Sequence, residues 1–277
     1  MKRVKDIADL LKKLLDCFEK EFSNLIKDNS FKLKEFDIDM DKRGYFSIKS
    51  DGKVYYNKEK IMCLLFLSKH LHNETVKNTA IYFANHEFTH NTQDFLKFNK
   101  EEWKQTSNEE IYYCRKESHE QSYYSFSNLK YIIEDFFVDK AIRQEIKQSE
   151  MIFKEFLIQN LHINLVKFNA LYAYINTDRS LTVDEKKDYI KDELLETKIF
   201  GKIIELSIRL LGLGYVQIID GIIEEEIPNL KNIIEKVYLS LLGLDFISLD
   251  IDSLKSNILA IFEYLDKADL LRILFGE

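Results

Sequence analysis

Apolar residues change their spacing twice along the chain, and each change predicts a new kind of element. Through residues 2–28 they recur at helical spacing, which predicts a long helix. The next segments, "FKLKEFDIDM" and "GYFSIKSDGKVYYN", alternate apolar and polar residues instead. The dipeptide Asp51-Gly52 separates "YFSIK" from "KVYYN" and is typical of a hairpin turn. We therefore predict a small antiparallel sheet across about residues 32–56.

Helical spacing returns at residue 58 and dominates the rest of the chain. The pattern predicts helices over 58–70, 75–97 and 127–148, with a loop containing some helix before the last of them. Beyond residue 149 nearly every segment is helical, with breaks at "NTDRSLT" and near Pro228. We expect an α+β, predominantly α-helical protein. Its front part, 1–148, would hold the sheet, and its back part, 149–277, would be all-helical.

Composition and charge argue against several classes of protein. Of the 277 residues, 45% are hydrophobic and 31% charged, which is enough apolar surface for a proper core. A net charge of −7 argues against nucleic-acid binding, which draws its affinity from a basic surface. The longest apolar run, "IMCLLFLS", is too short to cross a bilayer, and charges interrupt the first 20 residues before a signal-peptide core. Three scattered cysteines without a CxxC pair indicate reduced thiols, so we expect a cytoplasmic protein with no membrane partner.

The motif that carries chemistry lies in "NHEFTHNTQDF", residues 85–95, where His86, Glu87 and His90 belong to an HExxH sequence. Residues four apart stand about 40° apart on a helix, so both imidazoles can reach one metal ion. Glu87 is placed to take a proton from a zinc-bound water and to pass it to a leaving amine. The motif therefore predicts a catalytic zinc site. The alternative is two histidines on a solvated helix face.

A helical wheel of the 75–97 segment separates the motif from the expected core face. His86 and His90 lie almost opposite an apolar stripe and beside Thr79, Phe83, Gln93 and Asp94. The stripe consists of Ile81, Ala84, Phe88, Thr92 and Phe95. We expect the stripe to pack into the core and the histidines to line a cleft.

A catalytic zinc needs a third protein ligand, and the acids of "SNLKYIIEDFFVDKAI", residues 127–142, are the strongest candidates. Asp135 shares a mostly apolar stripe, where a lone carboxylate is costly unless it is paired or metal-bound. Glu134 shares a polar strip, so we favour Asp135 as the ligand and keep Glu134 in reserve. Asp139 would accept a hydrogen bond from the distal nitrogen of a zinc-bound histidine.

Other assignments stay open for this site. Asp135 and Asp139 could instead pair with nearby cations such as Lys140 and Arg143. His119, in the polar stretch upstream, is a further candidate for the third ligand or for a transition-state donor. The sequence alone does not separate these possibilities.

A sheet, then "HEFTH" on a helix, then a helix with two acids four residues apart resembles the zincin metallopeptidases. The segment "EDFFVD" is similar to the E/D-x-x-x-D ligand helix of the gluzincins within that clan. The resemblance covers roughly residues 45–145, and HExxH is its specific part. His90 is followed by "NTQDFLKF", which excludes the HExxHxxGxxH pattern of the metzincins.

The resemblance implies roles for particular residues. Asp135 would bind zinc and Asp139 would orient a histidine. An edge strand would lie along the cleft, where a substrate peptide adds as a further strand, and "KVYYN", 53–57, is the candidate. The oxyanion of the tetrahedral intermediate would need a donor besides zinc. The available side chains are His119, Tyr123, Tyr124 and Tyr131.

These observations lead to one expectation and two rivals. We expect a cytoplasmic zinc-dependent endopeptidase that acts on a protein or peptide substrate, with Glu87 as general base and then general acid. The helical back half would wall the cleft or recognise a partner. The first rival is a helical interaction or sensor module whose metal is absent or non-catalytic. The second is hydrolysis of a non-peptide amide by the same residues.

Overall fold

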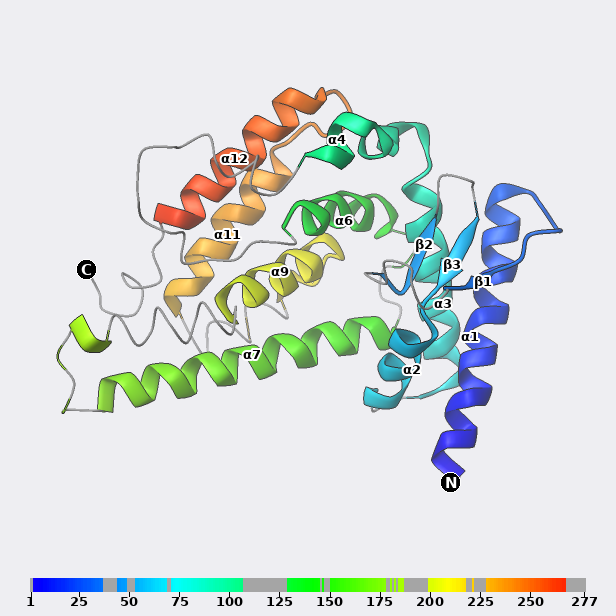
Figure 1. Cartoon of the computed structure of the whole chain (residues 1–277), viewed down its shortest axis with the longest axis horizontal. Helices are drawn as coiled ribbons and strands as arrows, with labels where there is room; N and C mark the ends of the chain where they lie inside the picture. The colour runs from blue at the N-terminus through cyan, green and yellow to red at the C-terminus, as the bar shows by residue number, and fades with distance from the viewer. Residues whose placement is uncertain are drawn as a thin grey trace. The chain divides into compact units, whose positions relative to one another are not determined.

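The protein is predominantly helical with one small sheet, as the hydrophobic pattern predicts (Figure 1). It is described here from a computed structural model of residues 1–277. The α+β, mostly helical fold class is therefore confirmed. The structure describes residues 2–36, 44–48, 53–68, 71–106, 129–144, 146, 150–177, 180, 182, 184–186, 199–217, 221 and 228–267.

The elements of the front of the chain follow the predicted order closely. They are α1 (Lys2–Ile26), β1 (Lys34–Glu35), β2 (Phe46–Ile48), β3 (Val54–Tyr56), α2 (Lys58–Leu67), α3 (Asn73–Thr89), the 3₁₀ helix η1 (Gln93–Asn99), α4 (Glu101–Gln105) and α6 (Leu129–Ile142). The described helices of the back half are α7 (Ile152–Thr177), α9 (Ile199–Gly212), α11 (Pro228–Leu242) and α12 (Ile251–Lys267).

The chain folds into two compact units that interleave in sequence. Unit 1 comprises Met1–Leu96 and Val138–Leu157, and unit 2 comprises Lys97–Phe137 and Ile158–Glu277. Each unit is therefore built from two separate stretches of the chain. The units do not coincide with the front and back parts, 1–148 and 149–277. The boundaries fall inside α6 and inside α7, and each of these helices is continuous. That either part forms an independent domain stays a prediction.

In unit 1 the helices α1 and α3 pack side by side (Figure 1). Aromatic rings from three elements join in its core. The Phe18 ring of α1 stacks on the Phe46 ring of β2 at 4.1 Å between centroids, and Phe46 lies 5.2 Å from Phe83 of α3. This apolar contact fixes α3, the helix of the HExxH motif, against the sheet.

The three strands form a mixed sheet in the order β1-β3-β2. β2 and β3 pair antiparallel, as expected, whereas β1 pairs parallel to β3. The prediction of a wholly antiparallel sheet is thus wrong for β1. The segment "KVYYN" is also not an edge strand, because β3 has a partner on each side. The Asp51-Gly52 turn lies outside the described residues.

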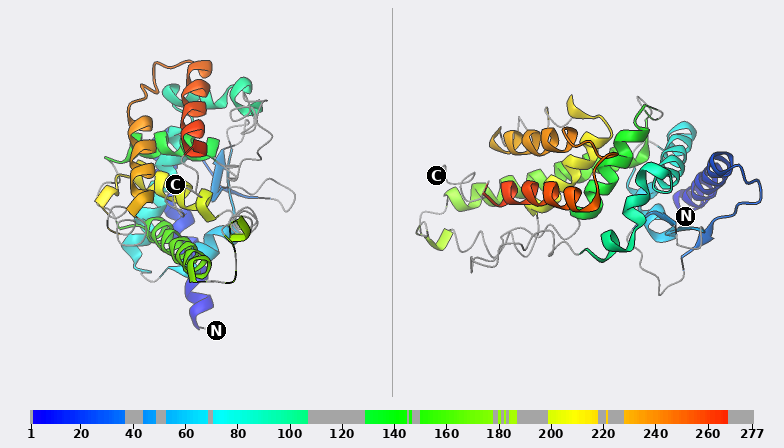
Figure 2. Two further views of the ribbon diagram at one scale, coloured as in Figure 1. Left: turned by 90° about the vertical axis from the view of Figure 1, so that its left-hand side faces the viewer. Right: turned by 90° about the horizontal axis from the view of Figure 1, so that it is seen from above.

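In unit 2 three helices of the back half gather around apolar side chains. Within the described part of this unit, α11 contacts both α9 and α12, and Figure 2 shows α11 and α12 running side by side. Phe137 of α6 stacks on Phe246 at 4.3 Å, and Phe98 of η1 lies 4.9 Å from the same ring. These contacts hold the first part of α6 within unit 2.

Candidate metal centre

Helix α3 carries the HExxH motif at its C-terminal end. The helix ends at Thr89, and His90 is its C-cap with helical backbone angles of φ −54° and ψ −22°. The backbone N–H of His90 donates to the carbonyl of His86 at 3.3 Å, so the two histidines lie one turn apart. The single helix predicted over 75–97 is wrong beyond this point, because the chain tightens into η1.

The core face of α3 differs from the predicted stripe. Ala84 and Phe95 are buried, but Ile81, Phe88 and Thr92 are only half-buried. Thr79, Tyr82, Phe83 and His86 are buried, although the wheel placed His86 and its neighbours away from the core. α3 is covered on most of its circumference, so a single apolar stripe does not describe it. The motif begins in the interior of the protein.

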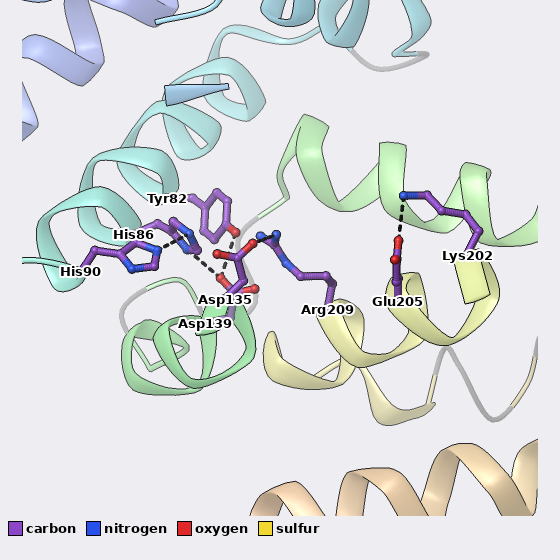
Figure 3. Close-up of polar contacts among 8 residues, drawn as sticks. All are labelled: Tyr82, His86, His90, Asp135, Asp139, Lys202, Glu205 and Arg209. Carbon is purple, nitrogen blue, oxygen red and sulfur yellow. Dashed lines mark hydrogen bonds and ion pairs between the residues drawn. The ribbon is translucent and has the colours of Figure 1, made fainter. Parts of the chain in front are cut away.

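Asp139 of α6 ties the first motif histidine to a buried hydrogen-bond network (Figure 3). Its Oδ1 lies 2.9 Å from His86 Nδ1 and accepts a hydrogen bond from the Tyr82 hydroxyl at 2.9 Å. Asp139 and Tyr82 are both fully buried. The hydrogen bond that we expected between Asp139 and a motif histidine is therefore present, and its partner is His86.

This network selects a tautomer of His86. A buried carboxylate accepts, so Nδ1 of His86 carries the proton and donates to Asp139. In the neutral ring Nε2 then presents a lone pair, which is the form that ligates a metal. Nε2 of His86 lies 3.2 Å from Nε2 of His90. Without an ion, a proton on His90 Nε2 would bridge the two nitrogens.

The two nitrogens have the spacing that one zinc ion requires. Ligand nitrogens about 2.0–2.1 Å from a tetrahedral ion are about 3.3 Å apart. Among the described residues that could hold a metal, one group stands out: His86, His90 and Asp135 each offer a ligand atom, and these atoms lie within 4.8 Å of one another. Two imidazoles and one carboxylate match the donor set of a catalytic zinc site with an open position. The residues present therefore fit the ion that the motif predicts.

Asp135 lies one turn before Asp139 on the continuous helix α6, and its carboxylate has a cationic partner. Nη1 of Arg209, on α9, donates to Asp135 Oδ2 (Figure 3). The alternative to metal binding was pairing with nearby cations such as Lys140 and Arg143, whereas the observed partner, Arg209, lies 74 residues away in the chain. The pairing depends on tertiary structure, which a local pattern does not encode.

Glu134, the reserve ligand, is held by a different contact. Its Oε1 accepts from the indole Nε1 of Trp103 on α4. The buried Lys130 fixes α4 beside α6, because its ammonium donates to the carbonyls of Trp103 at 2.6 Å and Thr106 at 2.9 Å. Glu134 is not one of the three residues of the group formed by His86, His90 and Asp135. The described residues therefore give no support to Glu134 as the third metal ligand.

Glu87 and Tyr131 are the remaining candidates that the structure describes. Glu87 is half-buried on α3, and its backbone carbonyl accepts from Asn91 Nδ2 at 3.1 Å. Tyr131 is 40% exposed near the start of α6. The other transition-state donors, His119, Tyr123 and Tyr124, lie outside the described residues. No choice among these donors follows, and all four stay candidates.

Two residues at the site were missed by sequence reasoning. Tyr82 precedes His86 by four residues, so a helical wheel could have placed it on the same face. Its polar tip then needs a partner when the ring is buried, and Asp139 is that partner. Arg209 is a charged residue within the apolar segment "SIRLLGLG", which weakly indicates that it needs a partner. Nothing in the sequence linked it to Asp135.

Comparisons with protein-family models, with curated proteins and with solved structures returned no match to this chain. In the part of the chain that the structure describes, no helix is both long and apolar enough to cross a membrane. The function is therefore inferred from the chemistry and geometry of the side chains.

Proposed function

We propose that this protein is a zinc-dependent peptidase. The observation that carries the proposal is the pair of Nε2 atoms of His86 and His90, 3.2 Å apart, with the tautomer of His86 set by Asp139. A solvated histidine pair has no need of a fully buried carboxylate behind it. The arrangement instead matches a ligand whose orientation is fixed by an outer hydrogen bond.

In this proposal His86, His90 and Asp135 hold the ion, and Asp139 with Tyr82 orients His86. Bound zinc supplies Lewis acidity, which polarises a carbonyl and makes water acidic enough to act near neutral pH. The protein's own part is to keep two neutral imidazoles and one carboxylate converging on one point. The hydrogen bond between His86 and Asp139 fixes one of these three ligands before any ion arrives.

Glu87 moves the proton. Its carboxylate takes a proton from the attacking water, whose oxygen forms a bond to the carbonyl carbon of the peptide. It then gives that proton to the nitrogen as the carbon–nitrogen bond breaks, and the products are a carboxylic acid and an amine. Glu87 follows His86 on α3 and is half-buried. A non-peptide amide would need the same proton transfers.

We further propose that the peptidase works in the cytoplasm on a narrow set of protein or peptide substrates. Among the described residues, Cys17 and Cys63 are free thiols, which fits a reducing compartment. The net charge of −7 makes nucleic acid an unfavourable partner. Unrestricted proteolysis would harm the cell, so we expect selectivity or gating. Cleavage of many unrelated unfolded proteins by the purified enzyme would contradict this last point.

The proposal is tested by metal content and peptide cleavage measured together. We expect about one zinc per wild-type chain by inductively coupled plasma mass spectrometry, and loss of that zinc in His86→Ala. Glu87→Gln should keep the zinc and lower the cleavage rate by about 100-fold or more, as expected for removal of a general base. Cleavage would be followed with a library of quenched fluorescent peptides.

Two outcomes would reject the peptidase. If the wild-type chain takes up no metal even when zinc is supplied, the helical interaction or sensor module replaces it. If Glu87→Gln changes neither peptide cleavage nor zinc content, any activity arises elsewhere. Retained zinc with hydrolysis of small amides alone would redirect the proposal to the non-peptide substrate class.

A further inference from the structure

The ion pair between Arg209 and Asp135 has no counterpart in the zinc site that the sequence predicted. Both side chains are largely shielded, with 13% of Arg209 and 22% of Asp135 exposed. A guanidinium removed from water needs a partner, because an unpaired buried charge is costly. The residues before and after Arg209 on α9, Ile208 and Leu210, are buried. The pair is thus half-buried in unit 2, and a part of each side chain still reaches water.

We infer that Arg209 is a positioning residue for the third metal ligand. It holds the Asp135 carboxylate in the orientation from which that group reaches the ion, and so it raises the affinity of the site for zinc. This inference rests on the proposed function and adds a residue to it. Arg209 acts through Asp135 and is not assigned any contact with metal or substrate.

The described geometry is compatible with both interactions at once. Arg209 donates to Oδ2 of Asp135, while the same Asp135 belongs to the group whose ligand atoms lie within 4.8 Å. A carboxylate has two oxygens with about four lone pairs, so it can accept from a guanidinium and still ligate an ion. One side-chain orientation serves both partners. Metal binding therefore does not require the ion pair to break.

The planar guanidinium suits this task better than an ammonium. Its N–H donors have a fixed geometry, so they define the plane as well as the position of a carboxylate. Hydrogen bonds that orient metal ligands in this way are commonly worth a factor of about 10–100 in metal affinity. Without Arg209, Asp135 would sample other rotamers, and zinc would have to order it again on binding.

α9 also offers a matched control. Lys202 lies on the same helix and pairs with Glu205 at 3.3 Å (Figure 3). Lys202 is 49% exposed, and neither member of its pair belongs to the ligand group. Lys202→Gln therefore removes one positive charge from α9 without touching Asp135. It separates loss of charge on α9 from loss of the specific contact.

The test is a zinc titration of the full chain against a chromogenic chelator. We expect Arg209→Gln to weaken zinc binding by about 10–100-fold. Arg209→Lys, which keeps the charge and loses the planar geometry, should fall between Arg209→Gln and wild type. Lys202→Gln should bind as wild type does. Far-ultraviolet circular dichroism of each metal-free variant would verify that it is folded.

A double-mutant cycle distinguishes positioning from a general structural effect. If Arg209 acts through Asp135, Arg209→Gln should change zinc affinity little when Asp135→Asn is already present. Cobalt provides a second readout, because its visible absorption depends on the ligand set. The spectrum of Arg209→Gln should move towards that of Asp135→Asn.

Specific results would overturn the inference. Wild-type zinc affinity in Arg209→Gln, or tighter binding, would mean that Arg209 is neutral or competes with the ion. An equal loss with and without Asp135→Asn would mean that Arg209 acts elsewhere. If Arg209→Gln does not fold, the same double-mutant cycle is run with Arg209→Lys. Wild-type zinc affinity in Arg209→Lys would then overturn the inference. Absence of zinc from the wild-type chain would instead reject the proposed function.

Discussion

The surroundings that α3 provides for Asp139 differ from those that α9 provides for Asp135, although the two acids lie one turn apart on α6. Asp139 is fully buried and meets a tyrosine hydroxyl and an imidazole. Asp135 stays partly exposed and meets a guanidinium. The boundary between the two compact units falls between them, after Phe137. Identical residue types on one helix therefore acquire different tasks from their partners.

The difference follows from what each partner can balance. Hydrogen-bond donors that carry no full charge orient a buried carboxylate, and the low dielectric of the interior strengthens their bonds. A guanidinium balances the full charge of a carboxylate and fixes its plane through N–H donors of defined geometry. Asp139 thus has the environment of an orienting group. Asp135 has a partner that fixes its orientation, which suits the ligand role that we propose for it.

The largest effect should come from removing the buried acid. Asp139→Ala leaves Tyr82 and His86 without their acceptor, and we expect a loss of about 2–4 kcal/mol in the free energy of unfolding. Asp135→Ala should cost less, about 1–2 kcal/mol, because the Arg209 side chain is not fully buried and water can partly replace its partner. Urea denaturation in the presence of a chelator measures both. Equal losses would erase the distinction between the two acids.

Substitutions of the acids on α6 should affect zinc affinity in a different order from the free energy of unfolding. Asp135→Asn is expected to weaken zinc binding by about 100-fold or more, since loss of a ligand exceeds the usual effect of an outer hydrogen bond. Glu134→Gln should keep wild-type affinity, because Glu134 is held by Trp103. Both are measured by chelator competition. The reverse ranking would make Glu134 the ligand.

A smaller change tests the outer part of the Asp139 network. Tyr82→Phe removes the hydroxyl and leaves the ring, and Asp139 keeps His86 as a partner. We expect a loss of about 1 kcal/mol in unfolding free energy and up to about tenfold in zinc affinity. Thermal unfolding and chelator competition report these two quantities. If zinc affinity is unchanged while stability falls, Tyr82 serves packing and folding but not ligand orientation.

The smallest effect concerns a second tyrosine–carboxylate pair, on the sheet. The Tyr56 hydroxyl donates to Glu35 at 3.2 Å, and the pKa of Tyr56 is raised above 10.0, first by burial and then by the charge of Glu35. A raised pKa in the folded state favours the neutral form. The stability that this contributes is full below the pKa of the unfolded chain and declines as pH rises towards the folded pKa.

Ultraviolet titration of the phenol groups can detect this shift. In Glu35→Gln the titration of Tyr56 should move to lower pH but stay above that of a free tyrosine, because burial remains. A Tyr56→Phe variant identifies which part of the absorbance change belongs to Tyr56. An unmoved titration in Glu35→Gln would mean that Glu35 does not contribute to the raised pKa of Tyr56.

Local patterns predicted the elements well and their partners less well. The period of apolar residues located α1, α2, α6 and the long helix α7, because helical spacing is a property of neighbouring residues. It failed where an element is covered on several sides. α3 is buried around most of its surface, so its wheel gave the wrong core face. The parallel pairing of β1 with β3 depends on a connection that the alternation of residues does not specify.

The sequence by itself determined the spacing of His86 and His90, the nearness of Glu87, and the turn that separates Asp135 from Asp139. Each of these relations spans at most four residues, and the geometry of a helix fixes them. Only the tertiary structure decided that Asp139 meets His86 and Tyr82, that Trp103 holds Glu134 and that Arg209 reaches Asp135. Those pairs join residues far apart in the chain, and packing of the helices, not their periodicity, brings them together.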